Sequence, residues 1–105
     1  MPNGSDLFWS LVDGLAKEDT RVHEGTIMGG RCVRVDGEFL ALVDYKGSGL
    51  VVKLPRERVQ DLIDQGVGRS FAPAGRVFKE WVSVLGRDES LWRSLLDEGL
   101  EFVAP

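Results

Sequence analysis

The stretch that decides the fold reads GRSFAPAGRVFKEWVSVL and runs from Gly68 to Leu85. Its first half is rich in Gly, Pro and Ala, residues that favour turns. Its second half places Trp81 in a run of alternating polar and apolar side chains, which is typical of a strand. The stretch therefore predicts two short strands, Phe71–Pro73 and Trp81–Leu85, that pair around Ala74-Gly75.

Upstream of this stretch, the region Val22–Leu54 changes to the two-residue period of strands. Asp36-Gly37 is a two-residue turn that tolerates positive φ angles, and an alternating run precedes it. Phe39–Val43 is apolar on both faces, which predicts a central strand covered by helices on at least one side. Leu50–Leu54 forms a further strand. Because the connections are short, these three strands are expected to form an antiparallel meander.

Three other segments have helical periodicity. The first helix is predicted over Ser5–Lys17, and a second begins after Pro55 and ends at Gly66 in a left-handed conformation. The last helix is predicted from Asp88 to Val103. Gly99 lies within its apolar stripe, where glycine costs up to ~1 kcal/mol relative to alanine. We therefore expect Gly99 to approach the sheet closely.

The predicted order is helix, three strands, helix, two strands, helix. Strands of one antiparallel sheet with helices packed against it make an α+β, two-layer fold. The chain has 105 residues, of which 43% are apolar and 29% charged, as expected for one domain over residues 1–105. The residues expected in or near the core are Phe39, Ala41, Val43, Leu62, Leu95 and Leu96.

Several short motifs recur in a specific order along the chain. They are Ile27-Met28-Gly29, Val35–Glu38, Leu40–Val43, Leu50–Pro55, Phe71-x-Pro73-x-Gly75-Arg76, Lys79–Val82, and finally Trp92 and Leu95. Together they resemble the N-terminal domain of TfoX/Sxy family proteins, a TfoX-N-like domain, over roughly Thr20 to Val103. The resemblance implies a secretion-chaperone-like α+β fold. The competence-regulation role attached to the family's name belongs to longer members that carry a second, C-terminal domain.

Bulk properties narrow the classes of partner. A net charge of −4 argues against gripping nucleic acid through its phosphates, so weak or no nucleic-acid binding is expected. The single cysteine, Cys32, excludes an internal disulfide and a cysteine-rich zinc site. No signal peptide is visible, and the apolar runs are far shorter than the ~20 residues of a membrane helix. A cytoplasmic protein without membrane contact is the expectation.

Motifs for catalysis are weak. His23 is the only histidine, and its strand-like context favours a surface position. Cys32 also lies in a predicted strand, where a buried small apolar residue is the simpler interpretation. A His23–Cys32 pair stays open, but no third group that would orient it is indicated. No catalytic, cofactor or metal residue is assigned, and we expect a protein that is not an enzyme.

The residues that packing explains least are Arg76, Lys79 and Trp81. If the valines of this strand face the core, Trp81 stands on the outer face beside cations, as a contact residue for a partner. In the alternative interpretation, the last helix or the Ala72-Pro73 loop covers Trp81.

Trp9 lies off the apolar stripe of the first helix and is another candidate contact residue. The sheet edges are expected to carry charged residues, namely Arg31, Arg34, Lys79 and Glu80. With Trp9, and also Trp81, as aromatic anchors, these edges predict a weak to moderate homodimer.

The preferred functional hypothesis is a non-catalytic regulatory module that binds another macromolecule, in the first place a protein not identified by the sequence. One alternative is a nucleic-acid-associated regulator of transcription or competence, which the resemblance implies. Another is a small-ligand binder or enzyme that uses a pocket between the sheet and the helices.

Overall fold

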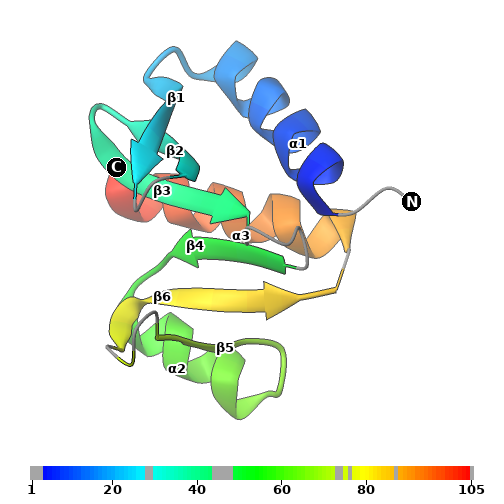
Figure 1. The fold of residues 1–105 in the computed structure, drawn as a ribbon, viewed down its shortest axis with the longest axis vertical. Coiled ribbons are helices and arrows are strands. Elements are labelled where there is room, and N and C mark those ends of the chain that lie inside the picture. Colours follow the sequence, from blue (N-terminus) through cyan, green and yellow to red (C-terminus); the bar gives the residue numbers. More distant parts are fainter. Residues whose placement is uncertain are drawn as a thin grey trace.

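The computed structural model describes residues 4–27, 30–43, 49–72, 75, 77–86 and 88–104. Its elements in chain order are α1 (Gly4–Glu18), β1 (Val22–Ile27), β2 (Gly30–Val35), β3 (Glu38–Val43), β4 (Gly49–Lys53), α2 (Arg56–Asp64), β5 (Arg69–Phe71), β6 (Phe78–Leu85) and α3 (Glu89–Val103). The strands form one sheet of six in the order β1-β2-β3-β4-β6-β5, with every neighbouring pair antiparallel (Figure 1). The predicted α+β fold is confirmed.

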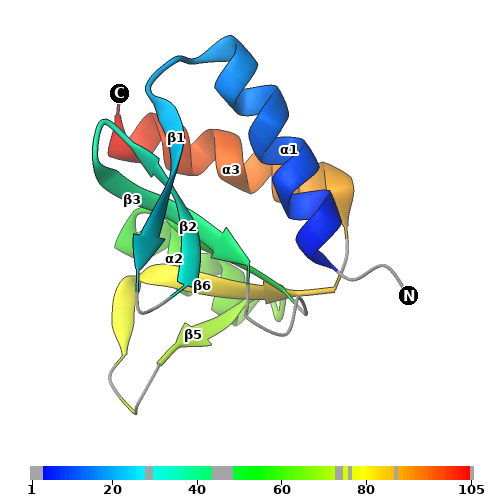
Figure 2. The ribbon, with the colours of Figure 1, turned by 45° about the horizontal axis from the view of Figure 1, so that its top comes forward.

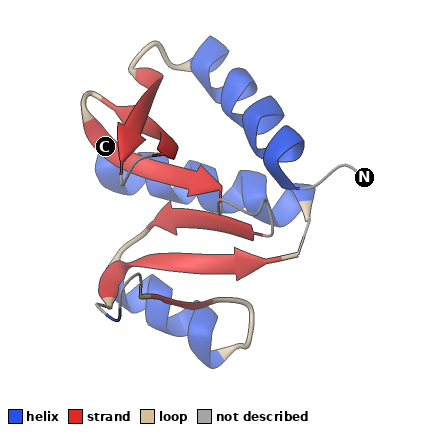
Figure 3. Ribbon diagram, viewed as in Figure 1, coloured by secondary structure: helices blue, strands red, loops and turns tan. Residues whose placement is uncertain are grey.

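The helices pack against one face of this sheet. In Figure 3, α2 and α3 lie behind the strands, and α1 lies across one end. Gly99 of α3 lies against Val52 of β4, while Leu62 of α2 shares a core cluster with Val82 of β6. Val52 and Val82 are opposite one another in the β4–β6 pair, so their side chains point to the same side of the sheet. The other face of the sheet carries no helix in the described part of the chain.

The core lies between the sheet and the helices and includes the fully buried Trp92 and Phe8. The predicted core positions are confirmed as buried or packed against the core: Ala41, Leu62, Leu95 and Leu96 are at most 2% exposed, Phe39 is 6% exposed, and Val43 is partly buried.

Phe39, however, lies on the face opposite to Ala41. Val33 pairs with Ala41 and Arg34 with Phe39, so β3 holds one extra residue, Leu40, at this point. In a regular strand Phe39 and Ala41 would share a face. The bulge directs Leu40 and Ala41 to the core cluster and turns Phe39 to the helix-free side.

The prediction of about five strands missed β1. Its sequence, VHEGTI, lacks a clear alternation, and of its side chains only Val22 is buried. Backbone pairing with β2 along its whole length, from Val22↔Val35 to Ile27↔Gly30, holds this strand instead.

The predicted strand limits and edges were also partly wrong. The strand placed at Phe71–Pro73 is β5, Arg69–Phe71, and β6 begins at Phe78 rather than at Trp81. The true edges are β1 and β5, which lie at opposite ends of the sheet (Figure 2). Arg31 and Arg34 of β2, like Lys79 and Glu80 of β6, therefore stand on interior strands.

The predicted turn at Asp36-Gly37, the left-handed Gly66 and the close approach of Gly99 are confirmed. Asp36 and Gly37 have φ angles of 51° and 84°, as the two-residue turn requires, and Gly66 has a φ of 75° just after α2. Gly99 approaches the sheet closely, because a Cβ added there would lie 2.9 Å from the carbonyl oxygen of Lys53.

Asp19 ties the end of α1 to β1. Its carboxylate accepts hydrogen bonds from the backbone N–H and the guanidinium of Arg21, with one at 2.7 Å, and these bonds hold the pKa of Asp19 at about 2. In the unfolded chain the pKa of an aspartate is about 3.9. Because the folded-state pKa is the lower one, Asp19 stabilises the fold above about pH 4, and this contribution is lost as the pH falls towards 2.

We therefore expect Asp19→Asn to lower stability at pH 7 and to matter progressively less between pH 4 and pH 2. Urea unfolding midpoints of the two proteins at pH 7, 4 and 2 measure this. A difference that is the same at all three pH values would contradict the role of the Asp19 carboxylate.

Candidate functional site

Trp81 lies on the helix-free face of the sheet. Its neighbour Val82 is fully buried in the core, and Trp81 pairs with Lys53 of β4. Because successive side chains of a strand point to opposite faces, Trp81 points away from the helices, as the alternation predicted. The indole is half-buried.

Phenylalanine rings surround the indole of Trp81 and form with it what we call the aromatic cluster, Phe39, Phe71, Phe78 and Trp81. The ring centroid of Phe39 is 4.0 Å from that of Trp81, with an interplanar angle of 17°. Those of Phe78 and Phe71 are 4.8 and 5.3 Å away, also close to parallel. The bulge in β3 makes this stack possible, because it brings Phe39 to this face.

The alternative in which the last helix covers Trp81 is wrong, since α3 packs on the other face of the sheet. Phenylalanines supply the cover instead, and they come from three strands: β3, β5 and β6. The other segment proposed to cover Trp81 was the Ala72-Pro73 loop, and Pro73 lies outside the described residues.

A groove opens beside the aromatic cluster. It has a volume of about 360 Å³, and its lining residues are Lys53, Arg56, Phe78, Lys79, Glu80 and Trp81. They come from the end of β4, the first turn of α2 and the start of β6. Its cations Lys53, Arg56 and Lys79, which we call the groove cations, share the lining with the aromatic rings of Phe78 and Trp81.

Of the predicted contact residues, Lys79 and Trp81 are brought together in this groove. Arg76 lies outside the described residues. The sequence analysis did not identify Lys53 and Arg56 as part of this site. They precede Trp81 by more than two dozen positions, and no local pattern links them to it. The pairing of β4 with β6 brings Lys53 opposite Trp81, and Arg56 follows shortly after β4.

Trp9, the remaining candidate, belongs to the opposite side of the sheet. It packs edge-to-face against Phe8, with the ring centroids 4.9 Å apart. The guanidinium carbon of Arg31 lies 4.0 Å from the centroid of the Trp9 ring, and Arg31 is held by Glu24 at 2.7 Å. Trp9 is thus half-buried under an internal cation–π contact.

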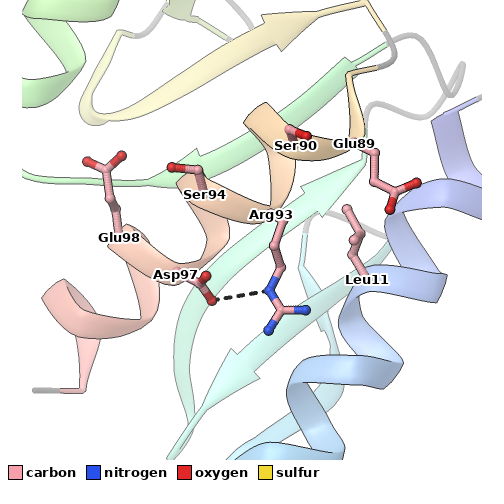
Figure 4. A pocket seen from close by; sticks show the side chains of 7 residues that line it. All are labelled: Leu11, Glu89, Ser90, Arg93, Ser94, Asp97 and Glu98. Atoms are coloured by element: carbon pink, nitrogen blue, oxygen red, sulfur yellow. Dashed lines mark hydrogen bonds and ion pairs between the residues drawn. The ribbon is translucent and has the colours of Figure 1, made fainter.

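A second hollow, of about 610 Å³, lies between α1 and α3. Its lining residues are Leu11, Glu89, Ser90, Arg93, Ser94, Asp97 and Glu98, all but the first of them polar or charged. Figure 4 shows Arg93 extending from α3 beside Leu11 of α1. Its guanidinium binds Glu18 at 3.0 Å and Asp97 at 3.4 Å. Arg93 therefore serves to hold the two helices together.

The potential catalytic pair has unsuitable chemistry. Cys32 is fully buried, and burial raises the pKa of its thiol, so the thiolate needed for attack is disfavoured. The exposed His23 has its Nδ1 3.0 Å from the carbonyl oxygen of Arg21.

Within the described ranges, no three His, Cys, Asp or Glu side chains are placed to hold a metal ion. In the same ranges, no helix combines the length and the apolar character needed to cross a membrane.

The arrangement thus offers a surface for contact: the exposed Arg56 and Lys79 and the partly exposed Lys53 lie beside a stacked aromatic cluster, on a sheet face without helices in the described part of the chain. Comparison with family models, with curated proteins and with solved structures finds no match for this chain.

Proposed function

We propose that this protein is a non-catalytic binding module that contacts a partner protein through the aromatic cluster and the groove cations. The observation that carries the proposal is the position of Trp81, half-buried on the helix-free face and bordered by Lys53, Arg56 and Lys79. Aromatic side chains and arginine are enriched at protein interfaces, where a rigid amphipathic ring loses little conformational entropy.

A protein partner suits this surface better than nucleic acid does. Proteins that bind single strands stack bases on open aromatic faces. Here Phe39 lies parallel to Trp81 at 4.0 Å and occupies one face of the indole. What Trp81 offers is an apolar rim for side-chain packing.

The resemblance to TfoX/Sxy proteins is part of this proposal. The fold is of the α+β class that the resemblance implies, yet fold alone does not specify function. The family name would favour a regulatory role, and a partner protein on the Trp81 face is compatible with it.

To test the proposed function, the immobilised protein is used to select binders from a displayed library of random 12-residue peptides. We expect peptides whose binding is lost with Trp81→Ala and kept with Trp9→Ala. The second variant is the matched control, because Trp9 is also half-buried but lies on the opposite side of the sheet. Far-UV circular dichroism verifies that both variants fold.

Chemical-shift mapping of backbone amides on the wild-type protein provides a measurement that does not depend on a variant. The shifts caused by a selected peptide should concentrate in β4, β6 and the first turn of α2. Shifts on α1 and α3 instead, or the absence of peptides that depend on Trp81, would contradict the proposal. Tighter binding of a twelve-nucleotide oligothymidine than of any selected peptide would favour a nucleic-acid function.

A further inference from the structure

We infer that the segment bound at this groove is acidic: a peptide stretch with several carboxylates next to an apolar side chain. This inference rests on the proposed function and specifies the chemistry of the partner. It follows from how the chain distributes its ion pairs.

Away from the groove, five arginines have partners within the fold. Arg21 binds Asp19 at 2.7 Å, Arg31 binds Glu24 at 2.7 Å and Arg58 binds Glu98 at 2.9 Å. Arg93 contacts two acids, and Arg34 donates to the carbonyl oxygens of Gly37 and Thr26. With 17 Asp and Glu residues against 13 Lys and Arg, acids are abundant enough to pair every cation.

The groove cations depart from this pattern. Among the described residues, the cationic side chains that make neither an ion pair nor a hydrogen bond are Lys17, Lys53, Arg56, Arg69 and Lys79. Three of these five line the groove. Arg69 pairs with Ser83 of β6, two positions from Trp81, and so stands on the same face. Only Lys17, on α1, belongs to another region.

The unpaired charges therefore gather around the aromatic cluster. Among the described residues that line the groove, Glu80 is the one acid, so the positive charges outnumber it. A partner with carboxylates would complement these cations, whereas a basic partner would be repelled. The rims of Trp81 and Phe78 provide the apolar contact between the charges, and the cations around them would steer an acidic segment into place.

Defined peptides test this inference by fluorescence anisotropy. The probe is a fluorescein-labelled 12-residue peptide in which Glu alternates with Leu around a central Trp, and the comparison peptide has Lys in place of every Glu. We expect the acidic peptide to bind and the basic peptide to bind at least about tenfold more weakly. Raising NaCl from 50 to 500 mM should weaken the acidic complex, because the contacts are exposed.

Charge-reversal variants locate the effect. Lys79→Glu and Arg56→Glu change exposed side chains, so neither disturbs the core, and a glutamate in the first turn of α2 is favourable to the helix. Each variant should bind the acidic peptide with about tenfold lower affinity than the wild-type protein does. Lys17→Glu is the matched control, with the same change in net charge on an exposed, unpaired lysine of α1, and it should change the affinity by less than about twofold.

The outcomes separate this inference from the proposed function. Peptides from the random library that depend on Trp81 but are neutral or basic would overturn the acidic partner and leave the binding module standing. An equal effect of Lys17→Glu and Lys79→Glu would also overturn it, as an effect of net charge alone. Failure to select any peptide that depends on Trp81 would remove the proposed function itself. Tighter binding of oligothymidine than of the acidic peptide, lost in Lys79→Glu, would assign the site to nucleic acid.

Discussion

Replacing Leu95 by alanine is expected to lower the free energy of unfolding by about 2–5 kcal/mol. Leu95 is fully buried in the core between α3 and the sheet. Truncating it removes apolar contacts and leaves a cavity that neighbouring side chains fill only in part. Urea denaturation, analysed by linear extrapolation, measures the loss.

Leu91→Ala is the matched control for Leu95→Ala. It removes the same atoms from the same helix, but Leu91 is only partly buried against the core. We expect its cost to be clearly smaller. A cost below about half a kcal/mol for Leu95→Ala would mean that α3 presents a different face to the sheet.

Gly99→Ala is the second substitution with a large expected effect, and its direction opposes intrinsic helix propensity. Alanine is favoured over glycine inside a helix by about 1 kcal/mol. At Gly99 the new Cβ would lie 2.9 Å from both Leu40 Cδ1 and the Lys53 carbonyl oxygen, and 3.0 Å from Val52 Cγ2. The carbonyl belongs to the backbone of β4 and cannot rotate away. We therefore expect a net loss of about 1–2 kcal/mol, and a larger loss for Gly99→Leu.

Gly14→Ala is the control for this prediction. Gly14 lies in the middle of α1, and the nearest atom to an added Cβ is Arg93 Nη1 at 3.7 Å, an ordinary contact. Here the helix propensity should decide the outcome, and the free energy of unfolding should rise by up to about 1 kcal/mol. Thermal unfolding of both variants tests these expectations: the melting temperature should fall for Gly99→Ala and rise for Gly14→Ala. Stabilisation by both substitutions would show that α3 lies farther from β4.

Much of the fold could be predicted because its signals are local. The spacing of apolar residues in Glu89–Val103 predicted α3 within one residue, since the period of a helix is carried by neighbours three and four positions apart. Gly37 and Gly66 adopt positive φ angles because glycine lacks a Cβ, and Asp36 can do so because its short polar side chain tolerates the left-handed region. The two-residue period predicted that Trp81 and Val82 point to opposite faces, and the burial of Val82 in the core then decided which face Trp81 takes.

The candidate site could be predicted only in part. Lys79 and Trp81 stand in one short segment, so the sequence showed them as a pair. Lys53 and Arg56 lie beside Lys79 and Trp81 because β4 pairs with β6. Composition and periodicity do not predict which strands pair. The ion pairs that distinguish neutralised cations from unpaired ones also connect distant residues, as in Arg58–Glu98.

The sequence by itself thus determined the three helices, the five strands other than β1, the turns, and the close approach of Gly99 to the sheet. Tertiary structure alone decided that VHEGTI is an edge strand, that the bulge at Leu40 sends Phe39 to the helix-free face, and that Arg31 stacks on Trp9. The physical reason is the range of the interactions. Dihedral preferences and periodicity act between near neighbours, whereas strand register and ion pairing depend on which distant segments the folded chain brings together.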